Sequence, residues 1–244
     1  MPTLETWGTS DPGLVRQNNE DSWSIDTVLR LAIVADGMGG ALCGEVASAI
    51  TVETVLECMR ASQADEPQRA VEAAILEANR RVFEKARAEE SCNGMGSTVV
   101  VAWWDVPHLL IANVGDSRAY LWRDGALRQL SYDQTLVNEL KVRFGLSESE
   151  VANFPHKNVL TMAVGTTAEL TIKTHDEQMI PGDIVLLCSD GLTGPVTEEA
   201  IAGILSREAP LHMQGEQLIA SAKAGGGPDN VTAVLLRYND WEIL

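Results

Sequence analysis

Aspartates stand at the ends of four apolar segments of this sequence, in positions from which they could bind metal. The segments read as buried strands; three of them run into an aspartate and the fourth follows one. An acidic pair, Glu20-Asp21, lies upstream of all of them. The four aspartates are Asp36, Asp116, Asp190 and Asp229. If the ends of these strands meet in space, the carboxylates form an all-oxygen site, which hard divalent cations such as magnesium or manganese prefer.

An aspartate followed by glycine is by itself more typical of a turn than of a metal site. Asp124-Gly125 separates two short strand-like runs, and this spacing predicts a tight hairpin turn without chemistry. Asp36-Gly37 and Asp190-Gly191, taken alone, are equally compatible with a structural turn. The residues around them distinguish the two interpretations.

Seven short motifs surround these positions in a fixed order. They are Arg16-Gln-Asn-Asn-Glu20-Asp21; Asp36-Gly-Met-Gly-Gly40 with Gly44-Glu45; Gly94-Met-Gly96-Ser-Thr98; Val114-Gly-Asp116-Ser-Arg118; Asn158-Val-Leu-Thr161 with Gly165; Cys188-Ser-Asp190-Gly-Leu192; and Gly227-Pro-Asp229-Asn230-Val-Thr232. In this order they resemble the metal-dependent protein serine/threonine phosphatases, the PPM or type 2C family, in its compact bacterial form. The matches run from about Gly13 to Leu236, nearly the whole chain.

The resemblance implies a ligand set for two tightly held manganese or magnesium ions. Asp36 would bridge both ions, joined by the backbone carbonyl of Gly37. Asp190 and Asp229 would complete the protein ligands of one ion. Glu20 or Asp21 would serve the other ion, directly or through water.

Two further residues take expected roles from the same resemblance. Asp116 matches, with Asp190, the position that binds a third, weaker ion in bacterial relatives; its alternative is a plain salt bridge to Arg118. Arg16 is expected to hold the phosphate, because a planar guanidinium donates two parallel hydrogen bonds to phosphate oxygens. Its alternative is a solvated surface arginine.

The sequence departs from the family pattern at three positions. Met38 stands where many eukaryotic relatives have a histidine considered as general acid, so we assign protonation of the leaving group to a metal-bound water. Gln134 and Met162 replace a common histidine and arginine near the variable flap, expected at about 144–157. We expect the changes at Gln134 and Met162 to affect substrate preference more than the chemistry of hydrolysis.

Composition limits the remaining classes of function. The chain has 244 residues, 45% of them apolar, and no linker-like segment, so we expect one domain over 1–244. A net charge of −17 opposes binding to nucleic acid or anionic lipid. Without a signal-like start or an apolar run near the ~18 residues of a membrane span, we expect a cytoplasmic protein. We also expect it to be a monomer.

The cysteines follow no paired spacing. They are Cys43, Cys58, Cys92 and Cys188. Two of them, Cys58 and Cys188, lie in apolar segments, and we expect all four to be reduced thiols.

The pattern of elements indicates an α+β fold. Helical spacing over 52–59 and 71–82 predicts two helices paired over a sheet, and Thr197 and the apolar residues after it predict a later pair. Strands are predicted at 97–104, 109–114, 118–122, 127–130, 170–174, 184–188 and 231–237, besides the run before Asp36. No regular βαβ alternation occurs. The resemblance implies an α-β-β-α sandwich of two packed, mainly antiparallel sheets.

The expected function is removal of phosphate from serine and threonine of proteins, opposing a serine/threonine kinase. Two alternatives stay open at this stage. One is a non-catalytic phosphatase fold that binds a partner, and the other is hydrolysis of small phosphate esters by the same metals.

Overall fold

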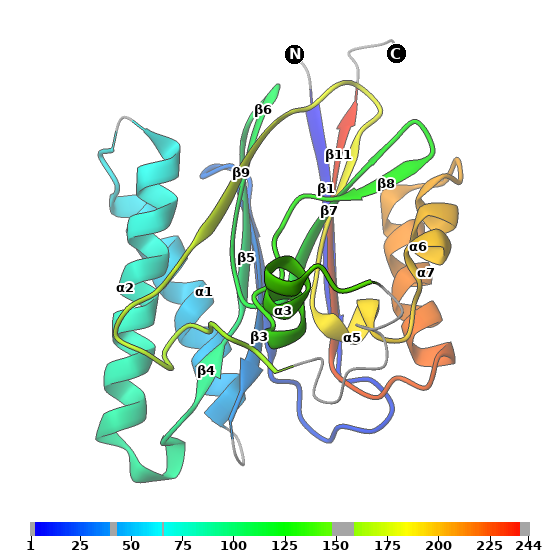
Figure 1. Ribbon diagram of the computed structural model, residues 1–244. Coiled ribbons are helices and arrows are strands. Elements are labelled where there is room, and N and C mark those ends of the chain that lie inside the picture. The colour runs from blue at the N-terminus through cyan, green and yellow to red at the C-terminus, as the bar shows by residue number, and fades with distance from the viewer. Residues whose placement is uncertain (1–2, 40–42, 65, 148–158, 240–244) are drawn as a thin grey trace.

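The computed structural model describes residues 3–39, 43–64, 66–147 and 159–239. Two β-sheets pack face to face, and helices cover both outer faces, so the chain forms four layers (Figure 1). The paired strands are antiparallel within each sheet, and the predicted α-β-β-α sandwich is confirmed.

The first sheet has the order β2-β3-β5-β6-β9, with β4 paired to β3, and the second has the order β1-β11-β10-β7-β8. The strands of the first sheet are β2 (Asp21–Asp26), β3 (Leu31–Met38), β4 (Gly96–Ser97), β5 (Val99–Asp105), β6 (His108–Val114) and β9 (Lys173–Gln178). Those of the second are β1 (Thr3–Asp11), β7 (Arg118–Arg123), β8 (Ala126–Gln129), β10 (Ile184–Cys188) and β11 (Val231–Asn239).

The helices lie on opposite sides of the sandwich. Helices α1 and α2 cover the first sheet, and α6 and α7 cover the second (Figure 1). Their bounds, with those of the short helices, are α1 (Cys43–Ala61), α2 (Pro67–Ala88), η1 (Glu90–Cys92), α3 (Leu136–Phe144), α5 (Asp190–Thr193), α6 (Glu198–Leu205) and α7 (Leu211–Ala224). In the described residues, no helix is apolar over a length that would span a membrane.

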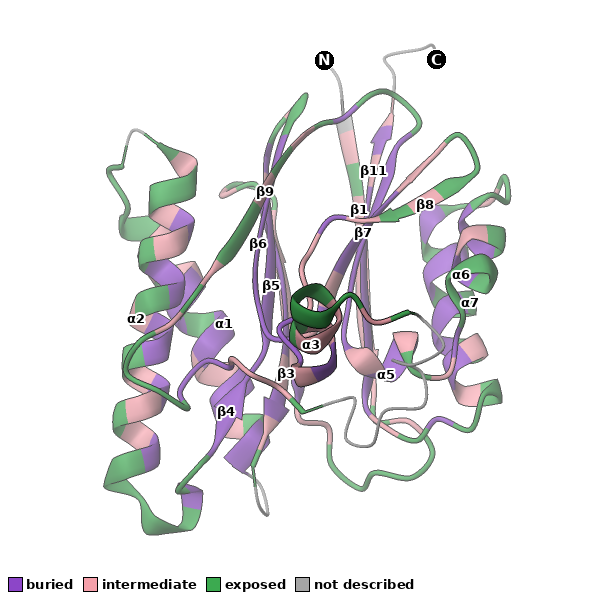
Figure 2. Cartoon of the chain, in the orientation of Figure 1, coloured by how far each residue is buried: buried purple, intermediate pink, exposed green. Residues whose placement is uncertain are grey.

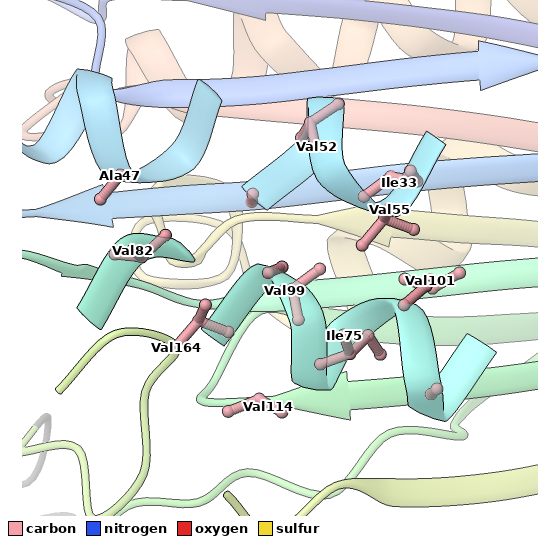
Figure 3. Packing of buried hydrophobic residues seen from close by; sticks show 14 of the residues in the cluster. Ile33, Ala47, Val52, Val55, Ile75, Val82, Val99, Val101, Val114 and Val164 are labelled. Carbon is pink, nitrogen blue, oxygen red and sulfur yellow. The ribbon is translucent and has the colours of Figure 1, made fainter. Parts of the chain in front are cut away.

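Both faces of each sheet are buried, which explains why the central strands are continuously apolar. In β3, Ile33 packs under α1 and α2, whereas Val34 points between the sheets. In β10, Leu187 points between the sheets and Leu186 packs under α6 and α7. Figure 2 shows this burial along the central strands, and Figure 3 shows the packing beneath α1 and α2. Side chains alternate between the faces of a strand, so burial of both faces removes the usual polar alternation.

Most predicted elements occur where expected, with a few differences. The last strand of the first sheet is β9 at Lys173–Gln178, later than the predicted 170–174. Strands β1 and β2 and helix α3 were not predicted, and neither strand carries a continuous apolar run. The hairpin turn is confirmed: Asp124 and Gly125 have φ of 51° and 85° between β7 and β8. Thr197 caps α6, since its side chain accepts a hydrogen bond from the N–H of Ala200.

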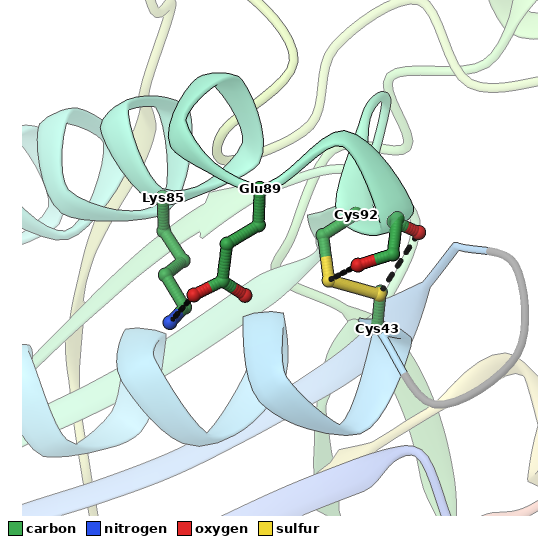
Figure 4. Close-up of a disulfide and its surroundings, with 5 residues drawn as sticks. Cys43, Lys85, Glu89 and Cys92 are labelled. Atoms are coloured by element: carbon green, nitrogen blue, oxygen red, sulfur yellow. Dashed lines mark hydrogen bonds and ion pairs between the residues drawn. A yellow bond between two sulfur atoms is a disulfide. The ribbon is translucent and has the colours of Figure 1, made fainter.

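The prediction of four reduced cysteines is wrong for two of them. Cys43 at the start of α1 and Cys92 at the end of η1 form a disulfide, with Cα atoms 5.4 Å apart (Figure 4). Cys58 and Cys188 are free, as expected. The pair is separated by 49 positions and is created by the packing of α1 against the segment after α2, which sequence spacing does not reveal.

Candidate metal centre

The ends of several strands meet around one pocket of about 250 Å³. Its lining residues are Arg16, Glu20, Asp36, Gly37, Met38, Gly39, Thr98, Asp116, Leu160, Asp190 and Asp229. Every residue predicted for the site lies on this pocket except Asp21. A larger hollow of about 760 Å³ lies at the opposite end of β5 and β6, beside the N-terminus of α2, and holds none of these residues.

Asp36 is held through its backbone near the end of β3. Its N–H donates to Thr98 Oγ1 at 3.0 Å, and its carbonyl accepts from the Thr98 N–H at 2.8 Å. Gly37 lies against the start of α1, where an added Cβ would stand 2.0 Å from the Gly44 carbonyl oxygen. This close approach, more than backbone freedom, explains why residue 37 has no side chain.

Asp229 and Arg16 form an ion pair at the mouth of the pocket. Arg16 Nη2 donates to Asp229 Oδ2 at 2.8 Å, although the arginine side chain is 50% exposed. Asn230 secures the loop that carries Arg16: its Nδ2 donates to the Asn18 carbonyl at 2.8 Å, and its Oδ1 accepts from the Glu20 N–H at 2.8 Å. Arg16 is therefore placed over the carboxylates by a buried asparagine, for which the sequence suggested no separate role.

Asp21 lies behind the pocket and is buried, with 8% of its surface exposed. Its Oδ2 accepts from Ser189 Oγ at 2.7 Å and from Thr232 Oγ1 at 2.6 Å, which joins β2 of the first sheet to β11 of the second and to the residue that follows β10. Its Oδ1 is buried without a hydrogen-bond partner. The structure thus separates Asp21 from Glu20, which the sequence treated as interchangeable.

The salt bridge considered as an alternative for Asp116 is absent from the described residues. Arg118 instead binds Asp133, with Nη2 2.6 Å from Asp133 Oδ2. Gln134 braces the turn before Asp116, because its Oε1 accepts from the Gly115 N–H at 2.8 Å while its Nε2 donates to the Thr171 carbonyl at 2.7 Å. Asp116 therefore lines the pocket, and its carboxylate forms no ion pair with Arg118.

Crowding of acids in a buried space raises their pKa values. Burial, followed by the charges of Asp21, Asp190, Asp116 and Asp229, raises the pKa of Asp36 well above its ordinary value. The pKa of Asp116 rises to about 7, mainly through burial and then the charge of Asp190. Burial is also the main cause that raises the pKa of Asp21 to about 6. A bound cation would relieve these repulsions.

The donor set fits a hard divalent cation, because the pocket presents carboxylate oxygens and the backbone of Gly37. Within the described residues, no three His, Cys, Asp or Glu side chains are already grouped as a complete metal site. The described histidines do not line the pocket, and His156 and most of the expected flap lie outside the described residues.

Comparisons with known protein sequences find consistent relatives. The family described as protein phosphatase 2C matches residues 12–222. The serine/threonine phosphatase stp of Listeria innocua is 35% identical over 237 residues, covering 94% of this chain and 94% of that protein. The phosphatase PstP of Mycobacterium tuberculosis is 35% identical over 96% of this chain, which covers 45% of PstP.

Solved structures show the same fold. The crystal structure of the serine/threonine phosphatase PstP/Ppp of Mycobacterium tuberculosis matches with a TM-score of 0.90 and 33% identity, covering 98% of this chain and 100% of that one. The PstP catalytic domain in complex with 2 manganese ions matches with a TM-score of 0.88 and 33% identity, over the same shares of the two chains.

Proposed function

This chain belongs to the protein phosphatase 2C family of metal-dependent serine/threonine phosphatases, and we propose that its acidic pocket is where it hydrolyses phosphoserine and phosphothreonine in proteins. One observation carries the proposal: carboxylates from distant parts of the chain and one arginine line the same 250 Å³ pocket. The similarity to a relative solved with 2 manganese ions supports dependence on metal.

We assign the ligands of a binuclear manganese or magnesium centre as follows. Asp36 would bridge the two ions, with the Gly37 carbonyl beside it, and Asp190 and Asp229 would hold one of them. Glu20, which lines the pocket, would serve the other. When bound, such ions lower the pKa of a water nucleophile and neutralise phosphoryl oxygens.

Asp21 receives an indirect role in this proposal. It does not line the pocket, and its Oδ2 is occupied by Ser189 and Thr232. The unpartnered Oδ1 is buried, so a water between Asp21 and the centre would satisfy it. Asp21 therefore supports the ligands rather than replacing Glu20.

Arg16 would bind the phosphate, and groups at the edge of the pocket would assist departure of the leaving group. Arg16 is half-exposed at the mouth, and a guanidinium has five N–H donors, of which the bond to Asp229 uses one. The Met38 thioether has no proton to donate, so the leaving alkoxide would take its proton from water. Asp116, at the edge with Asp190, would hold a third, weaker ion.

The partners follow from the same assignment. Phosphorylated proteins are the substrates, and a serine/threonine kinase would supply them. We propose one catalytic domain over 1–244, because β1 and β11, from the two ends of the described chain, pair in the second sheet. We also propose that the protein is a cytoplasmic monomer. The strong negative charge argues against nucleic acid as a partner.

Substrate comparison tests this function directly. The purified protein should release phosphate from a phosphothreonine peptide in the presence of Mn²⁺ and lose this activity in excess chelator. Faster turnover of free phosphothreonine than of the peptide would favour small esters as substrates. Mn²⁺ binding without turnover of any of these esters would favour a non-catalytic binding protein.

A further inference from the structure

The carboxylates of the centre come from two different sheets. Asp36 belongs to β3 of the first sheet, whereas Asp190 begins α5 just after β10, and Asp229 lies just before β11, in the second. Asp116 lies on the connection from β6 in the first sheet to β7 in the second. The spacing of the ligands therefore depends on contacts that hold the two sheets together at this end.

Thr98 makes one of these contacts from the junction of β4 and β5. It is buried, with 3% of its surface exposed, and both polar backbone groups of Asp36 bond to it. The Thr98 Oγ1 accepts from the Asp36 N–H, and the Thr98 N–H donates to the Asp36 carbonyl. Thr98 thus bonds both backbone groups of the residue that presents the central carboxylate, and Ser97 Oγ adds a second donor to the Asp36 carbonyl at 3.1 Å.

The same hydroxyl reaches the turn that carries Asp116. Thr98 Oγ1 lies 2.6 Å from the Oγ of Ser117, whose surface is fully buried. The Thr98 methyl group fills the space beside Gly115, where an added Cβ would stand 2.8 Å from Thr98 Cγ2. Gly115 also has φ of 92°, a left-handed conformation that favours glycine. Thr98 therefore contacts the residues on both sides of Asp116.

We propose that Thr98 is a positioning residue whose hydroxyl, through Ser117, couples the backbone of Asp36 to the turn bearing Asp116. The inference rests on the proposed function. Loss of the hydroxyl would leave the Asp36 N–H and the Ser117 hydroxyl buried without a partner. The turn would then move relative to Asp36, and the weaker cation position at Asp116 and Asp190 would lose affinity before the tight pair does.

Titration calorimetry with Mn²⁺ alone tests this coupling without catalysis. The wild-type protein should bind Mn²⁺ in a tight and a weak phase. Ser117→Ala, which removes one hydroxyl, should keep the tight phase and weaken the weak phase by about tenfold. Thr98→Val should lower the Mn²⁺ affinity of both phases. Thr98→Ser, which keeps the hydroxyl, should retain the wild-type affinity of the tight phase and most of that of the weak phase.

A buried hydroxyl elsewhere provides the matched control. Thr51 is fully buried in α1, and its Oγ1 donates to the Ala47 carbonyl at 2.8 Å. Thr51→Val should lower the melting temperature and leave both Mn²⁺ phases unchanged. Hydrogen exchange of the Asp36 amide in metal-free protein should accelerate in Thr98→Val and not in Thr51→Val.

Two results would overturn the coupling. One is a weak phase of wild-type affinity in folded Ser117→Ala, and the other is a wild-type protein that hydrolyses the phosphopeptide with no weak phase at all. Both leave the proposed function standing. A wild-type protein that neither binds Mn²⁺ nor hydrolyses the peptide would reject the proposed function, and the coupling with it.

Discussion

Arg118 binds Asp133 rather than its near neighbour Asp116. Its Nε donates to Asp133 Oδ2 at 2.9 Å and its Nη2 donates to the same oxygen at 2.6 Å. If Asp116 formed an ion pair with Arg118, its carboxylate would stabilise the fold and would not be available to bind a metal ion. With that arginine engaged elsewhere, Asp116 remains on the pocket as a candidate ligand.

Replacement of Asp116 should therefore affect substrates unequally. Asp116→Ala should keep two tight metals and a folded protein but turn over the phosphopeptide poorly. Hydrolysis of p-nitrophenyl phosphate should suffer less, because p-nitrophenolate leaves without needing a proton. Steady-state kinetics on both substrates checks this, and equal losses would contradict a role at the leaving group.

Replacement of the central ligand should be more severe on every substrate. Asp36→Asn removes negative charge that two ions would share, and we expect kcat to fall on the order of a hundredfold or more. Asp190→Asn and Asp229→Asn should act similarly. Asp124→Asn is the matched control, because this aspartate lies in the β7–β8 turn. A wild-type Mn²⁺ affinity in Asp36→Asn would contradict the assignment of Asp36 as the ligand of both ions.

Arg16 should influence binding more than the chemical step. If its guanidinium holds the phosphate equally in the ground and transition states, Arg16→Ala should raise KM on the order of tenfold and lower kcat less. Arg16→Lys should recover part of the loss, because it retains the charge but not the planar pair of donors. An unchanged kcat/KM in Arg16→Ala would indicate that Arg16 is a solvated surface residue with no role in phosphate binding.

The loss of activity that follows metal removal should be reversed by adding Mn²⁺. Excess chelator should abolish hydrolysis of p-nitrophenyl phosphate, and added Mn²⁺ should restore it, since the carboxylates without cations repel phosphate. The melting temperature should rise with Mn²⁺, because an ion that binds only the folded state stabilises it. Full activity in excess chelator would contradict the metal mechanism.

The metal-free protein should lose stability as the pH rises from acid toward neutrality. The folded-state pKa is about 7 for Asp116 and about 6 for Asp21, against an ordinary value of 3.8. Between these values the folded state binds more protons than the unfolded state, so the free energy of unfolding falls with increasing pH. Calorimetry in chelator at about pH 5 and about pH 7.5 measures this slope, which Asp116→Asn should flatten. A slope in Asp116→Asn equal to that of the wild type would contradict the shift.

The sequence alone predicted the layers of the fold, and it predicted the acidic residues that the structure brings to one pocket, except that Asp21 does not line it. Strands buried on both faces must be apolar throughout, so the runs ending at Asp36 and beginning after Asp229 could be recognised in the sequence. The Asp124-Gly125 turn was equally local, because its left-handed backbone needs no distant partner. The motifs and their order predicted the family that the comparisons then showed.

Tertiary structure decided the partners that are distant in sequence. It joined Cys43 to Cys92, paired Arg118 with Asp133, and bound Asp21 Oδ2 to Ser189 and Thr232 behind the pocket. Each of these outcomes depends on how separate strands and helices align across the layers. Sequence spacing records the order of side chains along one strand, whereas the register between two sheets is set by the packing of the whole core.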